Sequence, residues 1–180
     1  LWILTVAMVC TLAVPASAVE QNSFVLTAVN ANSVIIEPVR IPYTAGQSVK
    51  DALLASGHSF VGLEQGFIYE IDGITANFSL FYDGEGFDLS VDAADIRAIC
   101  IGVSSVYSEE LLDLIVAMAR FREMGNVQMF PDAVSAYEDG LAAIRNGNAQ
   151  TAAAVLTRLN GAIQAYEAIL NGPKYTVTVS

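Results

Sequence analysis

The chain has 180 residues, and its 19 acidic residues against eight Lys and Arg give a formal net charge of −11 at pH 7. Such a surface repels phosphate backbones and anionic lipid headgroups, which argues against nucleic acid and an anionic bilayer as partners. The length allows one large domain or two small ones.

Residues 1–18 predict a secretory signal that is not part of the fold. An uncharged apolar run ends at Pro15, and the small residues 16–18 form an A-x-A cleavage pattern. The run of about 14 residues is shorter than the ~20 that a membrane-spanning helix needs. A retained anchor is one alternative, and a lipid anchor at Cys10 is another, although the residue before that cysteine fits a lipobox poorly. We expect the mature protein outside the cell or in the cell wall, with no membrane contact after cleavage.

The number of cysteines indicates which kind of organism exports this protein. Cys10 is lost with the signal, so Cys100 remains alone and no intramolecular disulfide can form. Small secreted animal domains usually depend on disulfides, so an exported chain without them is typical of a Gram-positive bacterium. Cys100 lies in an apolar alternation, which predicts a buried hydrophobic residue.

From about residue 24 to residue 106 the hydrophobic period is mostly two. Two β-rich runs around the turn cluster NANS predict a hairpin, and prolines in the second run favour an edge or a bulge. Ser48 as N-cap and Gly57 as terminator bound a short helix. Further strands are expected at residues 67–73, 77–82, 87–91 and 95–103. The order β-β-α-β-β-β predicts a β-grasp-like α+β domain over residues 19–106.

From Ser108 onward the period is 3.6. Ser108 is a candidate N-cap for the first helix, Pro131 begins the second, and the third covers residues 149–170. Each helix has one apolar stripe, so short loops predict an antiparallel three-helix bundle over residues 107–172. We expect Gly140 to allow close approach of a neighbour. Residues 173–180 predict the first strand of a further, truncated β domain.

Several segments carry a resemblance to a known family. They are GQSVKDALL, FIYEIDGI, LFY before a Gly-rich turn, and ADIRAI, all within residues 46–101. This part of the chain resembles a bacterial family of unknown function related to the C-terminal β-domain of transcobalamin and intrinsic factor. The resemblance implies a β-grasp-like fold and, by analogy at the level of the fold, binding of a small ligand. Residues 133–141 and 159–163 resemble the three-helix FIVAR modules of Gram-positive surface proteins, which implies a spacer.

The candidate chemistry is sparse. His58 is the only histidine and follows a predicted helix end, which favours a surface position over catalysis. Asp83, Glu85 and Asp88 gather three carboxylates around a turn and could hold calcium, or they could be a solvated acidic turn. No spacing of Cys and His suits zinc, so no cofactor is expected.

Aromatic residues gather near the same turn. Tyr69, Phe78, Phe81, Tyr82 and Phe87 are explained mainly as core residues, and an exposed pair among them would bind glycan or peptide.

Three functions remain open. The first is a non-catalytic N-terminal segment of a secreted or wall-attached bacterial surface protein, acting in adhesion, ligand presentation or as a spacer ahead of downstream domains. The second is a module that binds a small, cobalamin-like ligand or a glycan. The third is an accessory region of an extracellular enzyme whose catalytic domain lies downstream.

Overall fold

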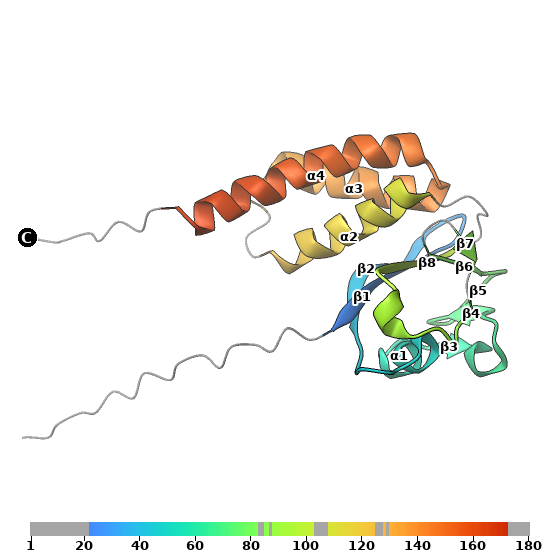
Figure 1. The fold of residues 1–180 in the computed structure, drawn as a ribbon. Coiled ribbons are helices and arrows are strands. Elements are labelled where there is room, and N and C mark those ends of the chain that lie inside the picture. The colour runs from blue at the N-terminus through green and yellow to red at the C-terminus, as the bar shows by residue number, and fades with distance from the viewer. Residues whose placement is uncertain are drawn as a thin grey trace, which may run out of the picture.

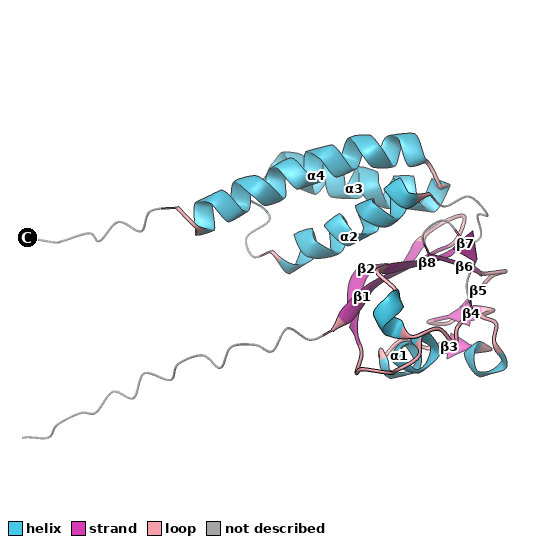
Figure 2. Ribbon diagram, in the orientation of Figure 1, coloured by secondary structure: helices cyan, strands magenta, loops and turns pink. Residues whose placement is uncertain are grey.

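The computed structural model describes residues 22–82, 85–86, 88–102, 108–124, 128 and 130–172. An N-terminal half of mixed sheets is followed by three packed helices, so the α+β class is confirmed (Figures 1 and 2). The predicted signal and the predicted strand at 173–180 lie outside the described residues. Within the described ranges, none of the helices combines the length and apolar character that crossing a bilayer requires.

The main sheet has five strands in the order β2-β1-β8-β6-β7. β1 (Ser23–Val29) runs antiparallel to β2 (Val34–Pro42) and parallel to β8 (Ala98–Gly102). β6 (Ser79–Tyr82) runs antiparallel to β8 and to β7 (Glu85–Gly86). The predicted hairpin is confirmed, and the strand that contains both prolines lies at the edge of the sheet, where a missing N–H donor costs least.

A second, small sheet contains β3 (Phe60–Val61), β4 (Glu70–Ile71) and β5 (Ile74–Thr75). The strand predicted at 67–73 is therefore reduced to two residues. The strand predicted at 87–91 is wrong for residues 88–91, which form a turn in which the Asp88 side chain accepts the Ser90 N–H at 2.8 Å.

The predicted short helix is α1 (Val49–Ala55), and its cap is the expected one. Ser48 Oγ accepts the Asp51 N–H at 3.2 Å, which satisfies one of the free donors of the first turn. α1 buries Val49, Ala52 and Leu53 against the sheet. Two single-turn 3-10 helices, η1 (Leu63–Gln65) and η2 (Ala93–Asp95), complete this half.

The three C-terminal helices are α2 (Glu109–Glu123), α3 (Pro131–Asn146) and α4 (Ala149–Leu170). Gly147 ends α3 in a left-handed conformation, and Asn148 caps α4 by accepting the Thr151 N–H at 3.0 Å. One expectation fails: Ser108 occupies the N-cap position of α2, but its side chain makes no capping hydrogen bond.

The five-stranded sheet separates two hydrophobic clusters. Alternate residues of β1 and β8 face opposite sides, as the pleat requires. The α1 cluster contains Phe24, Leu26, Ile99 and Ile101 together with α1 and Leu63. The helix cluster joins the other face of the sheet to α2, α3 and α4, and its sheet residues are Val25, Val29, Ala98 and Cys100. Figure 1 shows the same layers, with the helices on one side of the sheet and α1 with the small sheet on the other.

α2 lies between the sheet and the other two helices, so it is buried on more than one side. Its fully buried residues are Leu111, Leu112, Leu114, Ile115 and Met118. A single apolar stripe was expected, yet a helix that contacts neighbours on several sides needs apolar residues around most of its circumference. The domain boundary between residues 106 and 107 stays a prediction; the described residues on its two sides share the helix cluster.

Polar contacts also connect the sheet with the helices. Arg40 pairs with Glu123 at 2.9 Å, and Arg97 pairs with Asp113. The Tyr137 hydroxyl donates to Glu37 at 2.8 Å. Burial, followed by this hydrogen bond, raises the pKa of Tyr137, which keeps the hydroxyl protonated.

Gly140 makes the close approach that the sequence predicts. A Cβ atom at this position would lie 2.7 Å from Met118 Sδ and 3.1 Å from its Cε. The absence of a side chain on α3 therefore lets Met118 of α2 fill the space between the helices.

Candidate functional site

Two exposed aromatic rings form the most distinctive surface feature of the described residues. Phe67 is 54% exposed and Tyr69 is 45% exposed, whereas most large apolar side chains among the described residues are buried or half-buried. The ring centroids are 5.8 Å apart and the planes are inclined by 31°. We call these two residues the aromatic pair. Leaving two neighbouring rings in water forgoes the free energy of burying them, so the pair is a candidate for ligand contact.

A short glycine-bounded loop holds the aromatic pair in place. Gly62 and Gly66 have φ values of +94° and +87°, and they flank η1, whose Leu63 is fully buried. The Phe67 N–H donates to Gly62 O at 3.2 Å, and the Tyr69 N–H donates to Val61 O at 3.1 Å. The backbone beneath both rings is therefore fixed before any ligand arrives, which lowers the ordering cost of binding.

Gly62 also provides space for the rings. A Cβ atom there would lie 2.7 Å from Phe67 O and 2.9 Å from Tyr69 Cδ1. Two features of this position require glycine: the left-handed backbone and the close approach of the following chain.

An open groove of about 610 Å³ begins at Phe67. Its other lining residues come from the two neighbours of Phe67 in the loop before β4, from the chain around β6, and from the turn after β7: Gly66, Ile68, Phe78, Ser79, Leu80, Phe81 and Asp88. A ligand on the aromatic pair can therefore continue over a surface of mixed apolar and polar character that includes the Asp88 carboxylate. The backbone hydrogen bond from Ser90, the largest contribution, lowers the pKa of Asp88, so this carboxylate is charged at neutral pH.

The candidate residues from the sequence are only partly placed. Asp83 lies outside the described residues, as does the side chain of Glu85, so the calcium site stays a prediction. Among the described residues, no group of three His, Cys, Asp or Glu side chains could hold a metal ion. Of the predicted aromatic cluster, Phe78 is buried, Phe81 and Tyr82 are half-buried, and Phe87 lies outside the described residues.

Phe67 is the residue that the sequence interpretation missed. It was assigned to a strand, yet it lies before β4 and is the more exposed member of the pair. The available signal was the spacing of Gly62 and Gly66, because two glycines so close together favour a turn over a continuous strand.

His58 lies in the loop after α1, as expected, and its role in the structure is to connect two turns. Its Nδ1 is 2.8 Å from Asp72 Oδ2, while Asp72 Oδ1 accepts the Ser59 N–H at 2.8 Å. Partial burial acts to raise the pKa of Asp72, but the hydrogen bonds from Ser59 and His58 outweigh it, and the net pKa is lowered. These hydrogen bonds fix the β4–β5 turn, where Asp72 has a positive φ of 48°.

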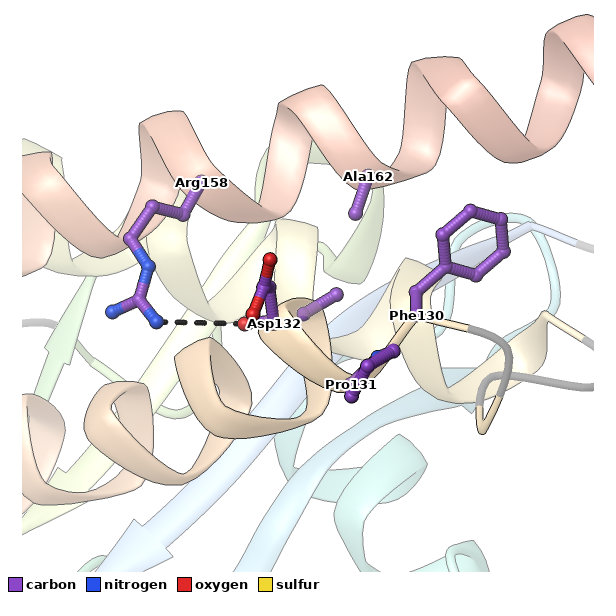
Figure 3. A pocket seen from close by; sticks show the side chains of 6 residues that line it. Phe130, Pro131, Asp132, Arg158 and Ala162 are labelled. Carbon is purple, nitrogen blue, oxygen red and sulfur yellow. Dashed lines mark hydrogen bonds between the residues drawn. The ribbon is translucent and has the colours of Figure 1, made fainter.

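A second pocket, of about 490 Å³, lies between the first turn of α3 and α4. Figure 3 shows Phe130, Pro131 and Arg158 around it. Arg158 would be its natural anion-binding group, but the guanidinium already donates to Asp139 Oδ2 at 2.7 Å and to the Asp132 carbonyl at 3.4 Å. An anion would have to compete with an existing carboxylate partner.

Comparison with models of protein families, with curated proteins and with solved structures finds no match to this chain. The assignment of a role therefore depends on the geometry of the aromatic pair and its groove.

Proposed function

We propose that this chain is a non-catalytic segment of a secreted or wall-attached bacterial surface protein, in which the β half presents the aromatic pair to a ligand and the three helices support it. The single observation that carries the proposal is the exposure of Phe67 and Tyr69 on a backbone fixed by Gly62. Fixed, exposed aromatic residues are typical of binding surfaces, since they contribute large contact areas at low entropic cost.

The proposed architecture is a β-grasp-like domain joined to an antiparallel three-helix bundle. The parallel pairing of β1 with β8, each flanked by an antiparallel neighbour, and the position of α1 on one face support the first part. The two-residue connection between α3 and α4 supports the second. On this proposal the resemblance to transcobalamin-related and FIVAR-like modules describes shape and does not specify a ligand.

The proposed location is extracellular or in the cell wall, because residues 1–18 have the pattern of a cleaved signal. N-terminal sequencing of the protein recovered from the medium or wall fraction of a Gram-positive host tests this. We expect the mature chain to begin at Val19. Recovery in the cytosolic fraction with residues 1–18 intact would contradict the proposed location.

The proposed role is tested by binding to an array of immobilised peptides and oligosaccharides. The purified chain is compared with a variant that carries Phe67→Ala and Tyr69→Ala. We expect array signals that the double variant loses and that the control Ile169→Ala retains, because Ile169 is an apolar residue of α4 that is 62% exposed and lies in the other half. If no array member distinguishes the chain from the double variant, the chain is a spacer and the proposed role is wrong.

A module for a small ligand or a glycan is the second candidate, and the groove beside Phe67 is the observation that favours it. Ligand pockets usually combine an apolar lining with a few polar groups. The groove offers apolar and polar surface together, although it is open. The oligosaccharides on the same array separate this candidate from peptide binding.

A further inference from the structure

The distribution of charge identifies the kind of ligand that the groove accepts, if the proposed binding function holds. Residues 51–96 contain no Lys or Arg, and their acids are Asp51, Glu64, Glu70, Asp72, Asp83, Glu85, Asp88, Asp92 and Asp95. This segment, which we call the acidic segment, contains the aromatic pair and every lining residue of the groove. Most of the net charge of the chain therefore falls within this segment of the sequence.

Outside the acidic segment, five carboxylates are paired with arginine within the protein. Five arginines contact carboxylates of the helices or of β2, in the pairs Arg40–Glu123, Arg97–Asp113, Arg120–Glu167, Arg122–Glu37 and Arg158–Asp139. The acidic segment supplies no Lys or Arg of its own for such pairs. Its negative potential therefore extends into solvent and attracts cationic groups.

The carboxylates lie close to the rings in the chain and at the rim of the groove. Glu64 is exposed within η1, between the two left-handed glycines, and Glu70 directly follows Tyr69. Asp88 lines the groove together with Phe67. An aromatic face attracts a Lys or Arg side chain through its quadrupole, and nearby carboxylates strengthen that attraction.

We infer that the aromatic pair and its groove bind an extended, Lys- or Arg-bearing peptide segment of a partner protein. A cationic side chain stacks on Phe67 and Tyr69, and the adjoining peptide lies over the mixed apolar and polar surface of the groove towards Asp88. The same charges repel sulfated, phosphorylated or carboxylated ligands, so acidic glycans and phosphate-bearing cofactors are poor occupants.

Fluorescence anisotropy with labelled peptides tests this inference. The probes are an extended Gly-Ser peptide with regularly spaced arginines, the same peptide with glutamine in place of arginine, and an uncharged glucose oligosaccharide. We expect the arginine peptide to bind the chain about tenfold more tightly than the glutamine peptide. Raising NaCl from about 50 mM to about 300 mM should weaken binding, because the contacts between exposed charges are screened.

Three variants locate the contact. Phe67→Ala with Tyr69→Ala should weaken the arginine peptide about tenfold. Glu64→Gln with Asp88→Asn should weaken it less and reduce the salt dependence, and the asparagine keeps an acceptor for the Ser90 N–H. Ile169→Ala should leave the affinity unchanged. Thermal melting of each variant establishes that it is folded before the titrations are compared.

Each outcome decides the inference. If the arginine peptide binds equally well to the double aromatic variant, binding is general attraction to an acidic protein and the inference is wrong. If the oligosaccharide or the glutamine peptide binds in preference and the double variant loses it, the inference is wrong while the proposed function stands. If no probe binds and the array also gives no signal, both fail.

Discussion

The helical half and the acidic segment use the same residue types in opposite ways. In the helical half the aromatic residue Phe121 is buried, and Arg120 and Arg158 each pair with a carboxylate of a neighbouring helix. In the acidic segment two aromatic rings face solvent, and no Lys or Arg accompanies the carboxylates. The proposed binding role of the acidic segment depends on this difference.

The first prediction tests whether the sheet and the three helices share one hydrophobic core. Ile115→Ala removes a fully buried side chain from the helix cluster, and we expect the free energy of unfolding to fall by about 2–5 kcal/mol. Since the cluster includes β1 and β8, the loss should shift the unfolding of both halves together in urea, followed by circular dichroism and by aromatic fluorescence. Two separated transitions would contradict the shared core. Ile169→Ala, on the exposed side of α4, should change stability by less than about 0.5 kcal/mol.

The second prediction concerns the loop that presents the rings. Gly62→Ala places a Cβ atom on a left-handed backbone and against Phe67 O. We therefore expect the free energy of unfolding to fall by about 2–4 kcal/mol. Gly57→Ala is the matched control, because Gly57 has a φ of +87° with nothing within 4 Å of its Cβ position. This control should lower the free energy of unfolding only by the cost of a left-handed backbone for alanine, about 1–2 kcal/mol. Equal losses in urea unfolding would show that the close approach at Gly62 is unimportant.

The third prediction tests the contact between Gly140 of α3 and Met118 of α2. Gly140→Ala improves helix propensity by about 1 kcal/mol but crowds Met118, and we expect a net loss of about 1 kcal/mol. In a Met118→Ala background the same substitution should become stabilising by about 1 kcal/mol, since the added methyl group enters the space that Met118 leaves. A double-mutant cycle measured by urea unfolding gives the coupling. Additive effects would contradict the contact.

The fourth prediction has the smallest effect and concerns Asp72. Its pKa is lower in the folded protein than the value of about 3.9 in an unfolded chain, so its stabilising contribution is present above that value. The contribution is lost as the pH falls through the lower, folded pKa. Asp72→Asn retains a residue type that tolerates a positive φ. Its melting temperature should lie below that of the wild type at about pH 7, and the gap should narrow below about pH 4. A constant gap would contradict the lowered pKa of Asp72.

Much of the fold could be predicted from local patterns. The turn cluster before β2, the capping serine of α1 and the terminating Gly147 are local signals, and the structure confirms the elements that they bound. The position of α2 between sheet and helices could not be derived, because periodicity identifies apolar positions without naming their partners. The run LLDLIVAMA was nevertheless a clue, since it is apolar on more than one side of a helix.

The hydrophobic pattern could not predict that both rings of the aromatic pair are exposed. The alternation in FIYEI places Phe67, Tyr69 and Ile71 on one side of an ideal strand, and Ile71 is indeed fully buried. Ile68, between the two rings, is buried as well, so the alternation changes phase at the bend at Tyr69, and the strand begins only at Glu70. Exposure of the pair therefore depends on backbone conformation rather than on the hydrophobic pattern.

Hydrogen exchange of the purified chain, with and without the arginine peptide, tests most directly whether the acidic segment is the binding region. We predict slower exchange in residues 61–82, where the aromatic pair and most of the groove lie, and unchanged exchange in α3 and α4. Protection that appears in α3 and α4 instead, or protection of residues 61–82 that persists in the Phe67→Ala and Tyr69→Ala variant, would contradict the division between a supporting half and a binding half.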